Sequence, residues 1–346
     1  MYVELSTTAQ TGYAQLLDAV TARELHRTAA ALAGSFSSKR IDGRTYWYYS
    51  YRLPGAGVQQ SFVGPDSGRL RTLIAEAKAP QPDNTRDLVR SYLALGGSAA
   101  PPQQVSLLKH LADAGFFRAG GVLIGTHAFL SYANVLGVRW DGGDQTTDVD
   151  LGWTERHLSI AVPASPKVDL HDALSTFESG FVPTAIIGKG LGAAYHSRKD
   201  PDFRVDFLTT LSKRGKGARH IEALNITAEA LPFMEFSLEQ PVQAVLFDTR
   251  GRTVLANVPP PARFAIHKLI VSDLRGIKFR AKITKDLGQA ASVIAWCTAH
   301  DPESLADARA EAEKRGPSWR RSLKAGWAQL QRVHPAVAAA AAETLG

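Results

Sequence analysis

Two aspartates, Asp148 and Asp150, stand one residue apart in the run Asp148-Val149-Asp150-Leu151. Alternation of acidic and apolar residues has the period of a β-strand, so both carboxylates are predicted on one face and both apolar side chains on the other. Two carboxylates side by side repel each other, and a cation between them relieves the repulsion. Because Mg²⁺ prefers hard oxygen ligands of this kind, the pair is a candidate metal site.

A turn upstream of this pair is suited to bind phosphate. Residues 121–124 predict a short buried strand that runs into Gly125-Thr126. Residues 127–138 carry apolar side chains at roughly helical spacing, so a helix is expected directly after the turn. The free N–H groups and the positive dipole end of a helix N-terminus bind anions. A phosphate cradle beside a metal-binding carboxylate pair implies chemistry on a nucleoside triphosphate.

A third acidic residue, Asp206, lies in the alternating run 203–208, between Val205 and Phe207. A carboxylate inside an apolar strand is costly to bury unless it faces a site or solvent. The pattern by itself leaves two interpretations open, a residue on a solvated strand face and a further ligand of the site.

The segments around these acids resemble the nucleotidyltransferase superfamily of the DNA polymerase β type. Its signature is a strand, a Gly-Gly or Gly-Ser turn, a helix, an Asp-x-Asp strand and a third carboxylate on a later strand. Thr126 departs from the Gly or Ser of that turn but keeps a hydroxyl. A closer resemblance, over about residues 120–291, is to a bacterial nucleotidyltransferase-fold family, the GSU-type NTP-transferase family. The segments that carry it are GVLIGTHAF, TTDVDL, FRVDFL, VPPPARFAIHKLIVSDLR and KITKDLGQA.

The resemblance implies nucleotidyl transfer, in which an acceptor hydroxyl attacks the α-phosphorus of an NTP and pyrophosphate leaves. Two metal ions neutralise the charge on the entering and leaving oxygens in such reactions. Asp148 and Asp150 would hold two Mg²⁺ ions, for which Mn²⁺ is the alternative. Asp206 would be the third carboxylate, completing the ion near the attacking hydroxyl and taking its proton. Gly125 and Thr126 would hold the β- and γ-phosphates.

Three further residues are candidates for the same site. Lys268 and Lys285 match the HKL and KD positions of the family, and one of them is expected to reach the triphosphate. His127 follows the phosphate turn as a candidate hydrogen-bond donor beside the site. The alternative, of equal weight, is that His127 has a packing role alone.

The composition is that of an ordinary globular protein. A length of 346 residues with 45% apolar and 21% charged residues suggests two or three domains. No apolar run approaches the roughly 20 residues that cross a membrane, and no secretory signal is evident, so we expect no membrane partner. The single cysteine, Cys297, excludes an intramolecular disulfide, which fits a cytoplasmic protein.

Charge and aromatic residues favour a nucleic-acid acceptor. The net charge of +7 favours a polyanion such as RNA, and a simple solubility charge is the alternative. Strands expected at 46–51 and 58–63 form a small meander whose aromatics sit beside Lys39, Arg40, Arg44 and Arg52, as in surfaces that stack bases and hold phosphates. A small apolar core is the alternative there. A basic loop is also expected over 211–220, and its candidate contacts to RNA or triphosphate are Lys213, Arg214, Lys216 and Arg219.

Together with the resemblance, the remaining patterns predict an α+β fold. We expect a polymerase-β-like nucleotidyltransferase mixed sheet with flanking helices, an N-terminal helix plus small β-meander, and a C-terminal helical domain after Pro259-Pro260-Pro261. The predicted domains are residues 1–102, 103–258 and 259–346.

The leading functional hypothesis is an enzyme that moves an NMP from an NTP to an RNA, with tRNA as the first candidate. Related families include tRNA-modifying toxins of toxin–antitoxin pairs, so the resemblance also implies a toxin role and an inhibitory antitoxin partner. One alternative is a small-molecule or protein acceptor. Another is a nucleic-acid-binding scaffold without chemistry, against which the presence of all three carboxylates argues. Calcium binding by residues 141–150 fails the EF-hand template.

Overall fold

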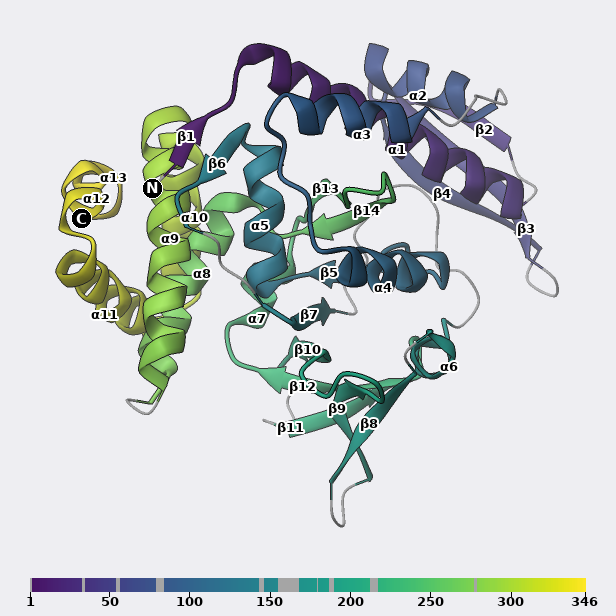
Figure 1. Ribbon diagram of the computed structural model, residues 1–346. Coiled ribbons are helices and arrows are strands. Elements are labelled where there is room, and N and C mark those ends of the chain that lie inside the picture. The colour runs from purple at the N-terminus through teal and green to yellow at the C-terminus, as the bar shows by residue number, and fades with distance from the viewer. Residues whose placement is uncertain are drawn as a thin grey trace.

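The computed structural model describes residues 2–32, 35–53, 57–78, 84–142, 146–154, 168–178, 180–186, 190–211, 217–276 and 279–346. Its centre is a mixed sheet of seven strands (Figure 1). The main path follows the order β11 (Gly217–Ile221), β12 (Ile226–Leu231), β10 (Arg204–Thr210), β7 (Asp148–Trp153) and β5 (Val122–Leu123). The sheet is extended by β9 (Gly190–Ser197), which pairs with β10, and by β8 (Phe181–Ile186), which pairs with β9.

The parallel neighbours β7 and β10 give the sheet an apolar face and a polar face. Alternate residues of both strands, such as Val149 and Phe207, are buried in the main core cluster. Residues of α4 (Pro102–Asp113) and α6 (Leu170–Thr176) belong to the same cluster and cover that face. The acidic side chains of the two strands are only partly buried and point the other way. The alternation predicted from sequence is therefore present in both strands.

The strand–turn–helix unit before β7 is also present. β5 is followed directly by α5 (Gly125–Val135), in the place of the strand predicted over 121–124 and the helix predicted over 127–138. The next strand, β6 (Val138–Trp140), pairs antiparallel with β1 (Tyr2–Glu4) at the N-terminus. The sequence patterns predicted neither of these two short strands.

The N-terminal helix and the β-meander are both present, and two helices follow them. These elements are α1 (Thr7–Leu32), β2 (Ser35–Ile41), β3 (Arg44–Leu53), β4 (Gly57–Pro65), α2 (Gly68–Lys78) and α3 (Thr85–Ala94). One end of α1 packs through Tyr13 on the hairpin of β13 (Val242–Phe247) and β14 (Thr253–Val258). The other end packs on the meander, where Leu25 shares a cluster with Tyr49. A single helix thus connects the meander to the centre of the molecule.

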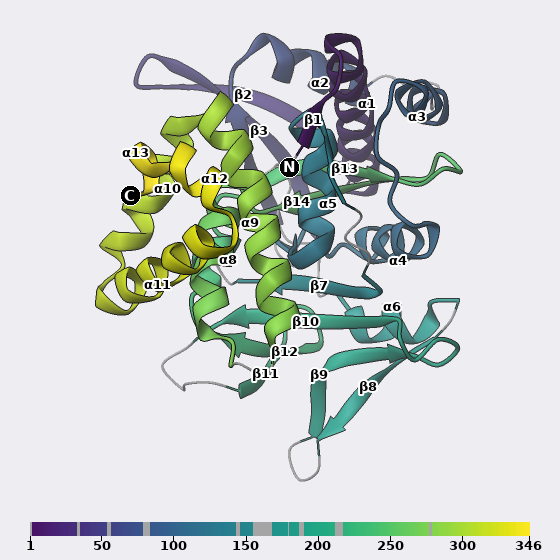
Figure 2. The same ribbon diagram turned by 60° about the vertical axis from the view of Figure 1, so that its left-hand side comes forward.

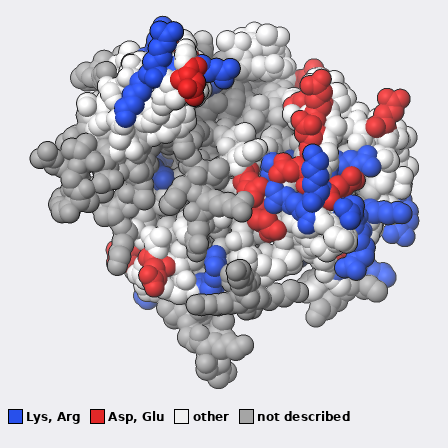
Figure 3. All heavy atoms as spheres, turned by 180° about the vertical axis from the view of Figure 1, so that it is seen from behind, with Lys and Arg blue, Asp and Glu red and all other residues white. Residues whose placement is uncertain are grey.

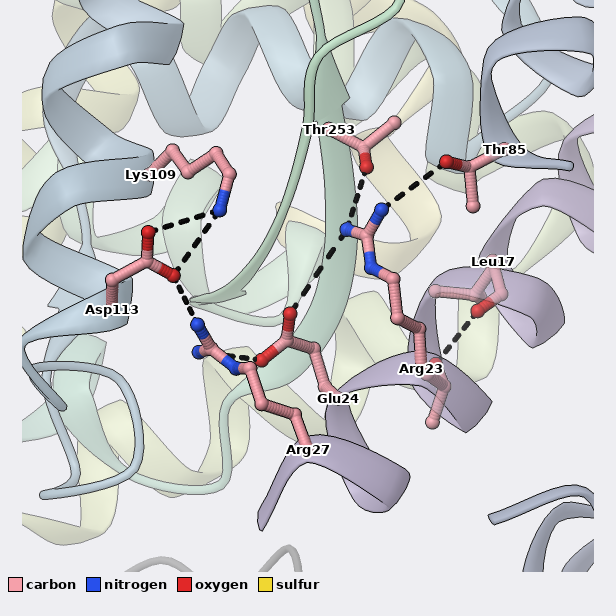
Figure 4. A network of polar contacts seen from close by, with 9 residues as sticks. Leu17, Arg23, Glu24, Arg27, Thr85, Lys109, Asp113 and Thr253 are labelled. Carbon is pink, nitrogen blue, oxygen red and sulfur yellow. Dashed lines mark hydrogen bonds and ion pairs between the residues drawn. The ribbon is translucent and has the colours of Figure 1, made fainter. Parts of the chain in front are cut away.

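Polar contacts hold the middle of α1 in place (Figure 4). Arg23 donates to the hydroxyls of Thr85 at 3.1 Å and Thr253 at 2.7 Å. Arg27 forms an ion pair with Asp113 at the end of α4. Thr253 of β14 and Asp113 of α4 lie after residue 102, so these two contacts cross the boundary predicted there, while Thr85 of α3 lies before it.

The region after the prolines at 259–261 is helical, as predicted. A short helix, α7 (Met234–Leu238), lies before the prolines. The described helices after them are α8 (Pro261–Leu274), α9 (Arg280–His300), α10 (Pro302–Lys314), α11 (Pro317–Val333), α12 (Pro335–Ala340) and α13 (Ala342–Leu345) (Figure 2). α11 crosses α8 at close range, since a Cβ on Gly326 would lie 2.0 Å from the carbonyl oxygen of Leu269. Only glycine permits this crossing.

Ion pairs link this helical region to the segment before it. Arg263 on α8 lies 3.6 Å from Glu239, and Arg315, which follows α10, forms an ion pair with the same carboxylate. From behind, acidic and basic side chains are interleaved on the side of the molecule where these helices lie (Figure 3). Arg263 and Arg315 thus share the acidic partners Glu239 and Glu311.

Some expectations need correction. Part of the segment 211–220, predicted as a basic loop, forms β11, so Arg219 lies on a strand. Strands β9 and β12 were not predicted. The mixed sheet, its flanking helices and the C-terminal helical region are compatible with the predicted α+β class. None of the described helices combines the length and apolar character that crossing a membrane requires.

Candidate active site

Strand register brings the three predicted aspartates to one polar face. β7 and β10 are parallel, and Asp206 is the direct cross-strand partner of Asp150. Asp148 lies two residues before Asp150 on β7 and therefore shares its face. Directly opposed side chains on neighbouring strands are close enough to interact. The site consists of three carboxylates on two adjacent strands.

An arginine that sequence reasoning missed lies among these carboxylates. Arg204 is the cross-strand partner of Asp148, and its guanidinium lies 3.3 Å from Asp148 Oδ2 and 2.7 Å from Asp206 Oδ2. The signal was available, because Arg204 stands two residues before Asp206 in the same alternating run. Arg204 supplies a positive charge between two of the three acids.

The N-terminus of α5 meets the side chain of Asp150. The backbone N–H of Ile124 donates to the carbonyl oxygen of Asp150 at 3.0 Å, which fixes the turn against β7. Gly125 has φ +64°, and a Cβ there would lie 2.1 Å from Asp150 Oδ2. Both the backbone conformation and the space therefore require glycine.

The hydroxyl of Thr126 is held by the C-terminal helices. Thr126 is buried, and its Oγ1 accepts a hydrogen bond from Gln289 Nε2 of α9 at 3.3 Å. Its side chain thus ties α5 to α9. Anion binding at this turn therefore falls to the backbone N–H groups at the helix N-terminus.

The nearby cations Lys268 and Arg204 do not fully offset the negative charge of the three carboxylates. Burial raises the pKa of Asp150 to about 6, and the charges of Asp206 and Asp148 add to this shift, while Lys268 and Arg204 oppose it. Burial also raises the pKa of Asp206, against the effect of Arg204. Such shifts mean that the ionised carboxylates favour an additional cation.

Lys268 on α8 is part of a buried charge cluster near the aspartates. Its Nζ lies 2.6 Å from Asp286 Oδ1, and Arg275 Nε lies 2.6 Å from Asp286 Oδ2. The side chain of Asp286 is only 4% exposed, and the two cations lower its pKa despite burial. Asp286, which pairs with both cations, was not singled out from the sequence, although it follows Lys285 in the quoted KD motif.

His127 and Lys285 interact at the other side of the turn. His127 is 1% exposed, and burial together with the charge of Lys285 lowers its pKa to about 4, against the opposing effect of Asp148. Its imidazole is therefore neutral near pH 7. The structure brings both residues to the candidate site, where His127 is a neutral buried side chain.

The predicted nucleic-acid contacts of the basic segment lie elsewhere. Arg219 donates to Thr209 Oγ1 at 3.1 Å, on the face of the sheet opposite Asp206. Lys213, Arg214 and Lys216 lie outside the described residues. Contact of this segment with RNA or triphosphate stays a prediction.

The side chains of the described residues do not by themselves form a ready-made metal centre. Within the described ranges, no group of three or more His, Cys, Asp or Glu side chains is placed to hold a metal ion. Mg²⁺ in nucleotide-dependent enzymes is, however, commonly bound by one or two carboxylates together with substrate phosphates. The adjacent Asp150 and Asp206 fit that mode.

Comparison with known proteins assigns the chain to a family. Residues 103–314 match the family model described as nucleotidyltransferase, and the match includes Asp148, Asp150, Asp206 and both candidate lysines. Neither the curated proteins nor the solved structures gave a match to the chain. Because the family match covers more than half of the sequence, the family resemblance expected from the motifs is confirmed, and the chain belongs to this nucleotidyltransferase family.

Proposed function

We propose that the chain is a magnesium-dependent transferase that moves an NMP from an NTP to a hydroxyl of an RNA, with tRNA as the first candidate. Transfer of an NMP in general follows from the family. The observation that supports these residues as the active site is the β7–β10 register, which sets Asp206 beside Asp150 at the N-terminus of α5.

Magnesium fits the donor set as an ion that arrives with the nucleotide. Two adjacent carboxylates with raised pKa values offer hard oxygen ligands and an unbalanced negative charge. Asp150, Asp206 and Asp148 would hold two ions in the scheme predicted from sequence, with Mn²⁺ as the alternative. When bound, such ions offset charge on the entering and leaving oxygens.

The chain's own residues supply the remaining functions. Backbone N–H groups of Gly125 and Thr126 bind the terminal phosphates at the positive end of α5. Asp206 accepts the proton of the acceptor hydroxyl, a role that its raised pKa suits. Lys268 offsets charge on the departing pyrophosphate, held in place by Asp286. Arg204 balances the carboxylates before nucleotide binds.

The RNA acceptor is supported by charge and by the aromatic meander. A net charge of +7 attracts a polyanion over long range. A toxin role with an inhibitory antitoxin partner rests on the resemblance to tRNA-modifying families. The other acceptor classes, a small molecule or a protein side chain, are distinguished by experiment.

The test is a transfer assay with the full-length protein, Mg²⁺, each α-³²P-labelled NTP, and total RNA, protein extract or no acceptor. We expect label in a tRNA-sized band with wild type and none with Asp148→Ala. Asp202→Ala, an exposed aspartate just before β10, is the matched control and should keep full activity. Label on protein instead of RNA would contradict the proposed acceptor. Undiminished transfer by Asp148→Ala would contradict the proposed active site.

A further inference from the structure

The β-meander presents one face to solvent and one to the interior. Across the three strands Tyr48 lies opposite Ser37 on β2 and Phe62 on β4. The neighbouring residue Tyr49 points to the other side, where it is fully buried beneath α1 and α2. The sheet therefore has its own small core, and the residues on the Tyr48 face are not needed for that core.

Three aromatic rings form a continuous platform on the outer face. The ring of Phe62 lies 5.9 Å from that of Tyr46 and 5.7 Å from that of Tyr48, measured between centroids. Phe62 is 40% exposed, and both tyrosines are only partly buried. The three rings pack on one another, but their outer surfaces stay partly open to solvent, which points to a ligand with flat apolar faces.

The platform is basic. Strands β2, β3 and β4 contain four basic residues and no acidic residue, namely Lys39, Arg40, Arg44 and Arg52. By strand alternation Lys39 and Arg44 share the face of the rings. Lys39 Nζ lies 5.0 Å from the centre of the Tyr48 ring and is held by a hydrogen bond to Gln60. On the side of the molecule where the meander and α2 lie, Lys and Arg side chains project beside a smaller acidic group (Figure 3, upper left).

We propose that this face binds a single-stranded segment of RNA, with bases stacked on Tyr46, Tyr48 and Phe62 and phosphates held by Lys39 and Arg44. Rings on a sheet beside cations are the combination that binds unpaired bases. A lysine over an exposed ring is held more weakly than a stacked base, so a base can displace Lys39 toward a phosphate. That this RNA is the acceptor rests on the proposed function.

The position of the face is fixed relative to the candidate active site. α1 packs through Leu25 under the meander and through Tyr13 on the β13–β14 hairpin, and Arg23 bonds to Thr253 of that hairpin. An RNA on the platform is thus held at a constant position relative to the aspartates. We infer that the meander selects the acceptor by its unpaired bases, away from the chemistry.

The test measures binding without catalysis. A fluorescein-labelled single-stranded 12-nucleotide RNA is titrated with the full-length protein in EDTA, without NTP, and its anisotropy is followed. We expect Tyr48→Ala/Phe62→Ala to weaken binding by about 10- to 100-fold. Tyr48→Phe keeps the ring and should bind like wild type. Lys39→Gln/Arg44→Gln should reduce the slope of log K against log salt by about 1.4, for two phosphate contacts.

Control variants distinguish RNA binding at this face from general electrostatic attraction to the protein. Lys324→Glu changes the charge on α11, on the opposite side of the molecule in Figure 1, and should leave binding within about twofold. Thermal unfolding of each variant checks that the fold is intact. Equal affinity for a duplex of the same sequence, equal competition by polyglutamate, or full binding by the double ring variant would overturn the proposal.

Failure of this proposal and failure of the proposed function have different outcomes. If the ring variant loses RNA binding but wild type transfers no nucleotide, the face stands and the catalytic proposal fails. If wild type labels RNA but the ring variant binds and is labelled equally well, the catalytic proposal stands and the face fails.

Discussion

At the scale of single residues, Asp150 is a proposed metal ligand whose ionised side chain lowers the stability of the folded apo protein. Its ionised form is disfavoured by burial and by the charges of Asp206 and Asp148. Unfolded chains have no such penalty, so the ionised side chain destabilises the apo protein. A residue kept at such a cost is characteristic of a functional site.

We expect Asp150→Asn to stabilise the apo protein at neutral pH. The folded pKa of about 6 lies above the unfolded value of 3.8, so the protonated form is favoured on folding. This contribution is complete below about pH 4 and is lost as the pH rises through about 6. The gain by Asp150→Asn should therefore be near zero at pH 4 and about 1–3 kcal/mol at pH 7.5. Urea unfolding in EDTA at several pH values measures it, and equal or lower stability of the variant at pH 7.5 would contradict the assignment.

Gly125 tests whether space beside Asp150 is essential. Gly125→Ala adds a Cβ 2.1 Å from Asp150 Oδ2 at a residue with φ +64°. Gly43→Ala is the matched control, because Gly43 has φ +78° and nothing within 4 Å of the added Cβ. Both should lose about 1–3 kcal/mol of stability through backbone strain. Only Gly125→Ala should lose Mg-NTP binding in calorimetry, and equal binding by the two variants would show that the close contact is unimportant.

At the scale of elements, the active site depends on α8 and α9 as much as on the sheet. Lys268 comes from α8, while Asp286 and Gln289 come from α9. The Lys268–Asp286 pair and the Gln289–Thr126 hydrogen bond join the two helices to each other and to α5. Movement of α9 would therefore alter both the lysine and the phosphate turn.

The Lys268–Asp286 pair should show energetic coupling. Asp286→Asn leaves Lys268, which is 12% exposed, and Arg275, which is 30% exposed, without their counter-charge and is expected to cost about 1.5–3 kcal/mol. Lys268→Met replaces the lysine with an apolar side chain of similar length. We expect a coupling energy of about 0.5–3 kcal/mol in the double-mutant cycle and a raised KM for NTP in both single variants. If Asp286→Asn lowers stability but leaves the KM unchanged, Asp286 has no positioning role.

At the scale of the whole molecule, the N-terminal region packs as part of the central structure. Tyr13 and Tyr92 share a buried cluster with Val245 and Phe247 of β13. The hydroxyl of Tyr13 accepts a hydrogen bond from the backbone N–H of Val245 at 3.0 Å. Apolar surface on β13 is therefore covered only when α1 and α3 are present.

Removal of residues 1–101 should consequently destabilise the rest of the chain. The truncated protein exposes the side chains of Val245 and Phe247, each of which is fully buried in the full chain. Exposing two such side chains costs about 3–6 kcal/mol. We expect a lower Tm and aggregation, measured by calorimetry and light scattering. A truncated protein that unfolds cooperatively at the temperature of the full chain would show that residues 103–346 are independent.

Much of the fold could be predicted from local patterns, and particular pairings could not. Alternation in 148–151 and 203–208, the glycine turn at 125 and the proline-led helices all depend on neighbours in the chain, so their signals were sufficient. Arg204 was missed because alternation places it on the face of Asp206 but does not show that Asp148, on another strand, is its partner. The segment ending at 220 was predicted as a loop because its basic residues obscured the short strand β11.

The sequence by itself determined which residue types belong to the site and the strand face that each aspartate occupies, because side-chain direction follows the two-residue period of a strand. Only the tertiary structure decided that Asp206 lies beside Asp150 and that Arg204 lies between Asp148 and Asp206. It also decided that Lys268 is held by Asp286 near these acids. The physical reason is that strand register and helix packing depend on contacts between distant segments, which no local period specifies.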